Sequence, residues 1–184
     1  MLRPEYPIET ERLLLRPYRE ADVDVLHDIQ SRPEVVRYLY WEPRTRERVE
    51  QVIRESGSQI EAEGNALELA IQPRDSDTMV GDVVLMYRSE AHRQGEIGFV
   101  LHPDHQGHGY ATEAAREMLR LGFEQLGLHR IIGRLEARNS GSAAVLERLG
   151  MRLEAHLHEN EWVKGEWQSE LVYAMLATEW ASLQ

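Results

Sequence analysis

The chain has 184 residues, of which 21 are Lys or Arg and 32 are Asp or Glu, so its formal net charge at pH 7 is −11. A chain of this length is expected to form one domain, residues 1–184, and its 42% hydrophobic content is sufficient for a buried core. The acidic excess argues against a nucleic-acid-binding module, which typically carries a basic surface. It favours cationic partners instead.

The chain contains no cysteine. This composition excludes disulfides, thiol nucleophiles, iron–sulfur clusters and cysteine-ligated zinc, and it fits a reducing compartment such as the cytoplasm. Residues 1–7 contain no apolar segment typical of a secretory signal. No apolar run approaches the ~20 residues that span a membrane. We therefore expect a cytoplasmic protein without a membrane-spanning segment.

Residues 11–101 are expected to form one strand and two helices, followed by three strands joined as hairpins. Thr45 is expected to cap a polar helix that continues to about Glu63, where Gly64 and Asn65 end it. Short polar turns separate the strands that follow, and such connections are typical of antiparallel pairing. The expected elements are a strand at 11–16, a helix at 22–29, a turn at 33–38, the helix at 45–63, and strands at 66–72, 79–87 and 94–101.

The hydrophobic period changes to that of a helix in the second part. Apolar residues between Ala111 and Leu126 recur at spacings of i, i+3, i+4 and i+7, which predicts an amphipathic helix that ends at Gly127. Gly150 at the C′ position closes a shorter helix. The expected elements are helices at 111–126 and 142–149 and strands at 130–137, 152–163 and 167–177. Together they predict an α/β domain with a largely antiparallel sheet.

The segment from Gln106 to Thr112, QGHGYAT, lies between an expected strand and the start of the strongest expected helix. Unpaired N–H groups, the helix dipole and the close approach permitted by Gly107 and Gly109 suit a phosphate group. The alternative is a tight turn whose glycines only supply positive φ. A P-loop is excluded because no GxxxxGK(S/T) string occurs. A dinucleotide-binding fingerprint would need a glycine at Thr112 and a parallel sheet, but Glu136 could supply its ribose-binding acid, so this alternative stays open.

Three segments resemble the GNAT superfamily of acyl-CoA-dependent N-acetyltransferases. Residues 106–111 match the family's pyrophosphate signature, Q/R-x-x-G-x-G/A. Residues 139–151 are similar to its later N-x-x-S…LGM segment. Residues 9–16, ETERLLLR, resemble the opening strand of the branch that contains the ribosomal-protein N-terminal (alanine/serine) acetyltransferases. The order of elements agrees with the family along essentially the whole chain.

The resemblance implies an α/β (α+β) fold with a mixed, largely antiparallel sheet of six to seven strands flanked by about four helices. Strands 4 and 5 of the family diverge, and pantetheine lies between them; here these strands are residues 94–101 and 130–137. Acetyl-CoA is the implied co-substrate, without a metal. The alternative role for Asn139 is a plain helix cap. The implied cofactor-binding residues are Phe99, Val100, Leu101, Gln106, Gly107, His108, Gly109, Tyr110, Ala111, Thr112, Asn139 and Ser142.

Acetyl transfer from a thioester to an amine needs a base, a donor to the carbonyl oxygen and a donor to the leaving thiolate. Glu96 matches a position where many relatives keep their base, and the alternative is a strand carboxylate paired with a neighbouring cation. A backbone N–H near Val100 is expected to stabilise the oxyanion. Many members place a tyrosine where this chain has Leu146, which cannot donate a proton. Ser142 resembles the serine used in the ribosomal-protein branch, and its alternative role is helix capping.

Substrate-binding residues are expected in the turn at 37–43 and the hairpin at 162–167, which the cofactor constrains least. The candidates are Tyr38, Tyr40, Trp41 and Trp162. An aromatic cluster that anchors a core or a subunit contact is the alternative.

The histidines at 102, 105 and 108 recur every third residue, but Pro103 and Gly107 interrupt any helix that would align them. We therefore expect loop histidines rather than metal ligands.

We interpret the chain as an acetyl-CoA-dependent N-acetyltransferase that acts on a primary amine, either a protein N-terminal α-amine of the ribosomal-protein type or a small-molecule amine. A non-catalytic CoA-binding or regulatory module with the same fold and a nicotinamide-dinucleotide-binding oxidoreductase are the alternatives. A homodimer is an expectation from the family that the sequence itself does not test. Residues 106–112 contain no carboxylate, so the acidic excess is expected elsewhere, part of it facing the ammonium group of the acceptor.

Overall fold

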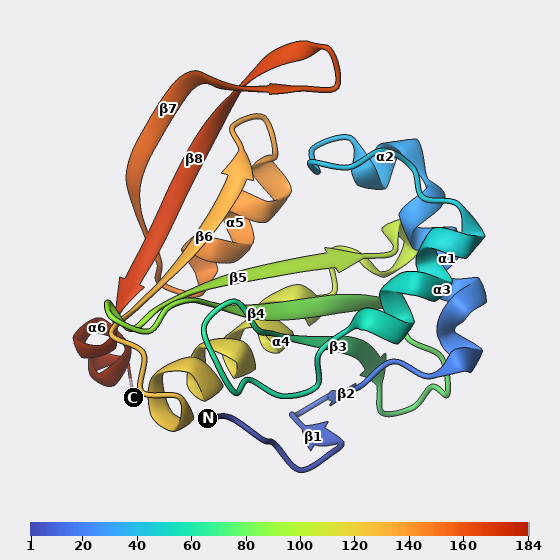
Figure 1. Ribbon diagram of the computed structural model, residues 1–184, viewed down its shortest axis with the longest axis horizontal. Helices are drawn as coiled ribbons and strands as arrows, with labels where there is room; N and C mark the ends of the chain where they lie inside the picture. Colours follow the sequence, from blue (N-terminus) through green and yellow to red (C-terminus); the bar gives the residue numbers. More distant parts are fainter. Residues whose placement is uncertain (184) are drawn as a thin grey trace.

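A computed structural model describes residues 1–183, which form one mixed sheet of eight strands with helices on both faces (Figure 1). The strand order is β1-β2-β3-β4-β5-β6-β8-β7, and neighbouring strands are antiparallel except β5 and β6. The strands are β1 (Ile8–Glu9), β2 (Leu13–Arg16), β3 (Ala66–Pro73), β4 (Gly81–Ser89), β5 (Gln94–Leu101), β6 (Arg130–Glu136), β7 (Arg152–Val163) and β8 (Glu166–Leu176). The helices are η1 (Glu20–Asp22), α1 (Val23–Ser31), α2 (Pro33–Val36), α3 (Arg46–Glu55), η2 (Pro103–His105), α4 (Tyr110–Arg120), the π-helical turn η3 (Leu121–Gln125), α5 (Ser140–Arg148) and α6 (Ala177–Ser182).

The predicted fold class is confirmed, with small differences in the number of elements. Residues 1–183 contain eight strands and six α-helices, against the six to seven strands and about four helices expected. The sequence did not indicate β1, α2 or α6, which have two, four and six residues. Elements this short do not complete enough periods to give a pattern. No helix within residues 1–183 combines the length and hydropathy needed to cross a bilayer.

Helix α3 begins as predicted and ends early. Thr45 is its N-cap, and its side chain accepts a hydrogen bond from a first-turn amide. The helix ends at Glu55, well before the predicted end at Glu63. Gly57 gives the physical reason, because a Cβ there would lie 2.2 Å from the carbonyl oxygen of Ala66. The chain therefore leaves the helix to pack closely against the start of β3.

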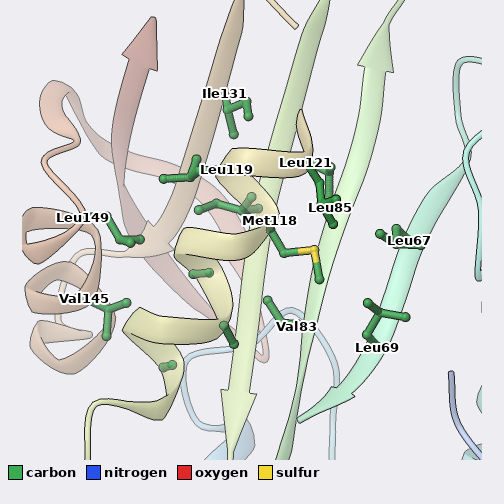
Figure 2. Close-up of a cluster of buried hydrophobic side chains, with 14 of the residues drawn as sticks. Leu67, Leu69, Val83, Leu85, Met118, Leu119, Leu121, Ile131, Val145 and Leu149 are labelled. Carbon is green, nitrogen blue, oxygen red and sulfur yellow. The ribbon is translucent and has the colours of Figure 1, made fainter. Parts of the chain in front are cut away.

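Helices α4 and α5 cover one face of the sheet and form the main core (Figure 2). Side chains alternate between the two faces along each strand, so every second apolar residue points toward these helices. The smaller cluster on the other face joins α1 and α3 to the sheet through Leu26, Val49, Ala70 and Met79. Figure 2 shows Leu67, Leu69, Val83, Leu85 and Ile131 from the strands, Met118, Leu119 and Leu121 from α4 and η3, Val145 from α5 and Leu149 directly after it.

Strands β5 and β6 separate in the middle of the sheet. They pair in parallel at three positions, of which Glu96 with Ile132 is the last. Beyond it, β5 stays paired with β4 as far as Leu101, and β6 stays paired with β8. The backbone groups of β5 that point toward β6 from Ile97 onward therefore have no partner in the sheet. This is the predicted divergence between residues 94–101 and 130–137.

Candidate active site

The predicted diphosphate loop, Gln106–Thr112, joins the C-terminal end of β5 and η2 to helix α4. Gly107 and Gly109 have φ values of +79° and +83°, a region that side chains with a Cβ rarely adopt. The first amide of this helix with an intrahelical acceptor is that of Glu113, which donates to the Gly109 carbonyl at 3.0 Å. The amides before it have no intrahelical acceptor and point out of the helix start. This geometry suits an anionic group.

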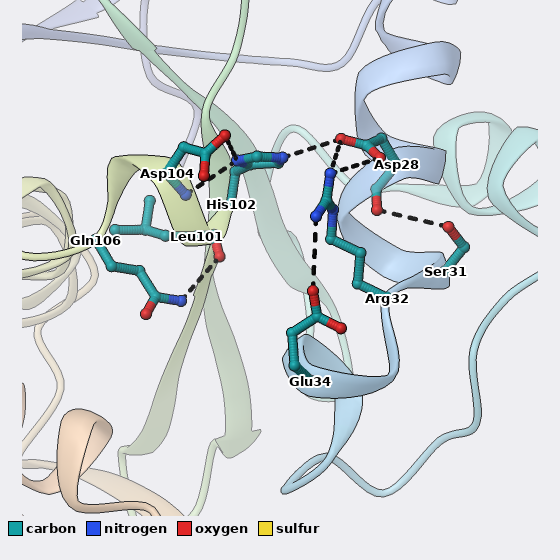
Figure 3. A network of polar contacts seen from close by, with 8 residues as sticks. All are labelled: Asp28, Ser31, Arg32, Glu34, Leu101, His102, Asp104 and Gln106. Atoms are coloured by element: carbon teal, nitrogen blue, oxygen red, sulfur yellow. Dashed lines mark hydrogen bonds and ion pairs between the residues drawn. The ribbon is translucent and has the colours of Figure 1, made fainter.

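The segment before the loop is fixed to α1 by polar contacts (Figure 3). The Nδ1 atom of His102 accepts from the Asp104 amide at 3.2 Å, so its Nε2 carries the proton that it shares with Asp28 at 2.9 Å. Arg32 donates to the same carboxylate at 3.0 Å, and these groups, Arg32 first, hold the pKa of Asp28 below its ordinary value. His102 is therefore an anchor of the loop. Within residues 1–183, no group of three or more His, Cys, Asp or Glu side chains is arranged to hold a metal ion.

The predicted pantetheine-binding residues Phe99, Val100 and Leu101 lie on the unpaired part of β5. The side chain of Gln106 donates to the Leu101 carbonyl at 3.3 Å and closes the turn that follows. The open strand edge thus leads directly to the free amides of the loop. An extended arm with several amides that ends in a diphosphate, as in coenzyme A, fits this sequence of elements, because an unpaired strand edge binds extended amide groups.

Helix α5 carries the other residues expected to contact the cofactor. Asn139 caps this helix, since its Oδ1 accepts from the Ser142 amide at 3.1 Å. This contact agrees with the capping alternative for Asn139 and leaves its NH₂ group for a cofactor contact, which stays a prediction. Ser142 uses its backbone N–H in the cap rather than its hydroxyl. Leu146 is buried against Gly133, where a Cβ would lie 2.7 Å from its Cδ1, so this position belongs to the core.

Glu96 lies at the last paired position of β5 and is 8% exposed. One of its oxygens accepts from Arg88 Nε at 2.9 Å and the other accepts from Arg134 Nε at 3.3 Å. These contacts match the alternative interpretation, a strand carboxylate paired with cations. A carboxylate has about four acceptor positions, so each oxygen of Glu96 keeps one for a further donor. Its role as the base stays a prediction.

A second buried carboxylate extends these contacts to the neighbouring strands. Arg134 reaches Glu170 on β8, with Nη1 at 3.5 Å from Oε2, and the Tyr40 hydroxyl donates to the same oxygen at 2.7 Å. Burial, followed by the hydrogen bond to Glu170, raises the pKa of Tyr40, so the phenol is a donor at neutral pH. We name Tyr40, Arg88, Glu96, Arg134 and Glu170 the Glu96 network. It connects the segment after α2 to β4, β5, β6 and β8 where β5 and β6 diverge.

Three of these residues, Arg88, Arg134 and Glu170, were not among the sequence candidates. A charged residue within an otherwise apolar strand was the available signal, as for Glu170 in the strand around Leu171 and Tyr173. The signal is weak because half the residues of a strand normally face solvent.

The predicted substrate-binding residues lie at two places near the Glu96 network. Tyr40 is the aromatic residue of its segment that bonds to this network. The hairpin β7–β8 meets the same region, because Lys164 Nζ donates to the Val36 carbonyl at 2.5 Å. The remaining candidates pack against neighbours: Tyr38 lies under Arg37 (5.2 Å from guanidinium carbon to ring centroid), Trp41 under Arg44 (4.0 Å) and Trp162 against Trp167 (5.3 Å between rings). Their contact with a substrate stays a prediction.

A further group of ionisable side chains includes Asp82 on β4, beside the paired edge of β5. Asp82 on β4 is the register partner of Val100, and its Oδ2 is shielded from solvent without a hydrogen-bond partner in the described chain. Burial first, and then the nearby Glu68, raises the pKa of Asp82 to about 7, while Arg44 opposes the shift. The sequence did not mark Asp82, since one carboxylate in the expected strand 79–87 is typical of a solvent-facing strand position.

The site combines an open strand edge, a glycine loop at a helix start and a buried carboxylate where β5 and β6 diverge. This combination suits an enzyme that transfers an acyl group from coenzyme A to an amine. Comparison with known proteins agrees. Residues 12–152 match the family model of the acetyltransferase (GNAT) domain. The chain belongs to the GNAT acetyltransferase family and is an acetyl-CoA-dependent N-acetyltransferase.

Individual relatives support this family membership over nearly the whole chain. The uncharacterized N-acetyltransferase YnaD of Bacillus subtilis is 32% identical over 173 residues, which cover 94% of this chain and 98% of YnaD. The crystal structure of a GNAT-family acetyltransferase from Bacillus anthracis has a TM-score of 0.84 at 30% identity and covers 97% of this chain and 100% of its own. Spermidine N(1)-acetyltransferase of Escherichia coli is 24% identical over 157 residues, which cover 85% of this chain and 82% of that enzyme.

Proposed function

We propose that this enzyme acetylates a primary amine by direct attack of the amine on acetyl-CoA, and that the acceptor is the N-terminal α-amine of a protein. The observation that carries the proposal is the divergence of β5 from β6 beyond Glu96. It leaves one continuous path from a buried carboxylate, along an open strand edge, to the free amides at the start of α4. A direct transfer needs these three parts in this order.

The chain holds the cofactor mainly through backbone groups. Residues Phe99 to Leu101 pair with the amides of the pantetheine arm, and the amides from Gly107 to Thr112 bind the diphosphate. The NH₂ group of Asn139 adds a side-chain contact to the arm. When bound, acetyl-CoA supplies the acetyl group as a thioester, which an amine can attack once it has lost its proton.

Three groups of the chain serve the transfer itself. Glu96 accepts a proton from the ammonium group of the acceptor, directly or through one water, at the acceptor positions that Arg88 and Arg134 leave open, and the neutral amine then attacks. The amide of Val100 donates to the carbonyl oxygen as negative charge develops there. The hydroxyl of Ser142 donates toward the sulfur, and a weak donor suffices because a thiolate whose conjugate acid has a pKa of about 8.5 is a fair leaving group.

The acceptor side favours a cation. Glu170 is 5% exposed and lies beside the predicted transfer point, with Glu136 buried on the adjacent strand. An N-terminal α-amine is the first candidate because residues 9–16 resemble the opening strand of the ribosomal-protein branch. A polyamine is the second candidate, supported by the likeness to the spermidine enzyme of Escherichia coli. Both acceptors are ammonium ions at neutral pH, which carboxylates attract.

A matched set of acceptors tests the proposal. Purified enzyme receives acetyl-CoA and one of three amines: a short peptide with a free N-terminal alanine or serine, the same peptide with a blocked N-terminus, or spermidine. Free CoA is measured with a thiol reagent. We expect release with the free peptide and none with the blocked one. Release with spermidine alone selects the second candidate, and calorimetric CoA binding without release for any amine supports a non-catalytic module instead.

A further inference from the structure

The opening motif of the chain lies against the start of helix α4. Thr10 and Leu13 form a tight turn between β1 and β2, in which the Thr10 amide donates to the Leu13 carbonyl at 3.0 Å and the Leu13 amide donates to Thr10 Oγ1 at 3.1 Å. This turn presents Arg12 to Glu113 in the first turn of α4, 101 residues further along the chain. The motif therefore has a defined place next to the diphosphate loop.

Glu113 is bound by three donors from this turn. Its Oε1 accepts from the Thr10 hydroxyl at 2.6 Å and from the Arg12 amide at 2.7 Å, and its Oε2 accepts from Arg12 Nε at 2.7 Å. Burial would raise the pKa of Glu113, but these hydrogen bonds outweigh it and hold the pKa below the ordinary value. The carboxylate that follows Gln106–Thr112 is thus neutralised by Arg12 and held by the turn between β1 and β2.

Arg12 also contacts the glycine segment itself. Its Nη1 donates to the His108 carbonyl at 2.9 Å, and its guanidinium carbon lies 5.2 Å from the centre of the Tyr110 ring. A Cβ on Gly109 would lie 3.2 Å from Arg12 Nη2. The contacted carbonyl belongs to the residue between two glycines in the left-handed region. A glycine segment loses more conformational freedom on ordering than any other, so a fixed contact here limits that loss before a ligand binds.

We propose that Arg12 is a positioning residue, which holds the loop Gln106–Thr112 in the conformation that binds the cofactor diphosphate, and that Glu113 and Thr10 hold Arg12 in place. The inference rests on the proposed cofactor site. Arg12 acts through the loop backbone and not through its charge, because Glu113 compensates that charge. Removing either partner of the Arg12–Glu113 pair therefore weakens binding of the diphosphate.

The alternative is a direct role, in which the Arg12 guanidinium binds a phosphate oxygen. The two roles predict opposite results for Glu113→Gln. A direct ligand becomes freer and more positive when Glu113 loses its charge, so CoA would bind more tightly. A positioning residue loses its support, so CoA binds more weakly.

Three variants and one control test the proposal: Arg12→Gln, Glu113→Gln, Thr10→Val, and Arg74→Gln as the control. Arg74 suits this purpose because its side chain is 42% exposed, against 47% for Arg12, and it pairs with Glu9 near the same turn. For each protein, calorimetry gives the Kd of CoA, and competition with acetyl-CoA gives the affinity of pantetheine, which lacks the diphosphate and the nucleotide. Steady-state kinetics give kcat at saturating acetyl-CoA.

We expect Arg12→Gln to weaken CoA about tenfold, as for loss of a charge-assisted hydrogen bond, with pantetheine affinity and kcat unchanged. Glu113→Gln weakens CoA in the same direction, and Thr10→Val does so about twofold. If Arg12→Gln does not fold, the other two variants carry the test. An unchanged or tighter Kd of CoA in Glu113→Gln overturns the proposal, as does equal loss of pantetheine affinity. If the wild-type enzyme binds no CoA, the proposed cofactor site itself fails.

Discussion

The cofactor side and the acceptor side of this site are built from different groups. The proposed cofactor side, Ile97–Thr112, offers mainly backbone groups: an unpaired strand edge and free amides around two glycines. The proposed acceptor side is the Glu96 network, a set of polar and charged side chains from four strands and the segment after α2. A site made of backbone groups suits acetyl-CoA, the co-substrate that the family members share. A site made of side chains can change its acceptor specificity by substitution without changing the cofactor site.

Glu96→Gln should produce the largest effect among the proposed variants. It should lower kcat and leave CoA binding unchanged. Glutamine keeps the shape but cannot take up the ammonium proton, so we expect kcat to fall about 100-fold or more, within the range of a lost general base. The Kd of CoA should stay within about twofold of wild type, since the cofactor contacts are backbone groups.

The exposed Glu55→Gln serves as the control for this variant. Steady-state kinetics and calorimetry give kcat and the Kd. An unchanged kcat with a lowered melting temperature would mean that Glu96 only pairs with Arg88 and Arg134.

Asp82→Asn tests whether the shielded carboxyl group of Asp82, on β4 beside the divergence, limits stability. The Asp82 carboxyl ionises near its ordinary pKa of 3.8 when unfolded and near 7 when folded, because burial and then Glu68 disfavour its charge. Between these values the folded state keeps a proton that the unfolded state has lost, so rising pH lowers the free energy of unfolding. Asparagine removes this loss, so the stability of the variant relative to wild type should rise by about 3 kcal/mol between about pH 5 and pH 8.

Thermal melts across this pH range, with the exposed Asp75→Asn as the control, measure the gain. A difference in stability that does not vary with pH would show that Asp82 is ionised in the folded enzyme at all these pH values.

Gly107→Ala tests the cofactor side. Both Gly107 and the control, Gly127, have positive φ (+79° and +71°), and a Cβ would meet nothing within 4 Å at either one. The strain of about 1–2 kcal/mol is therefore similar, but only Gly107 lies in the diphosphate loop. We expect calorimetry to show CoA binding weakened about tenfold by Gly107→Ala and unchanged by Gly127→Ala. Equal CoA affinities in the two variants would place the diphosphate elsewhere.

The cofactor side could be predicted from the sequence because its information is local. Six consecutive residues, 106–111, contain two positive-φ glycines and a helix start, and the structure shows both features. The change of hydrophobic period at Ala111 located the helix. The divergence of β5 from β6 was predicted from the resemblance to the family, because no local pattern in either strand indicates where their pairing ends.

The acceptor side depends on contacts between distant residues and was predicted in part. Tyr40 and Glu170 are 130 positions apart, and neither is unusual in its own segment. Arg134 alternates with apolar residues in its strand as any solvent-facing residue does. Only the tertiary structure shows that Tyr40 and Arg134 both contact Glu170 and that Glu170 is buried. The same is true of Arg12 and Glu113, whose pairing fixes a loop that the sequence otherwise described well.

Tyr40→Phe should give the smallest effect and test the division between the two sides most strictly. Phenylalanine keeps the ring and removes the hydroxyl that donates to Glu170 at 2.7 Å, which leaves that buried carboxylate with Arg134. We expect the acceptor KM to rise about threefold, as for loss of one hydrogen bond to a charged group at a half-exposed site. The Kd of CoA should not change.

Because the pKa of Tyr40 lies above its ordinary value, the effect of Tyr40→Phe on the acceptor KM should be constant from about pH 6 to pH 9. Tyr38→Phe in the same segment is the control. A change in CoA affinity in Tyr40→Phe would show that the acceptor side and the cofactor side are coupled. The backbone groups of Ile97–Thr112 would then not bind the cofactor independently of the acceptor.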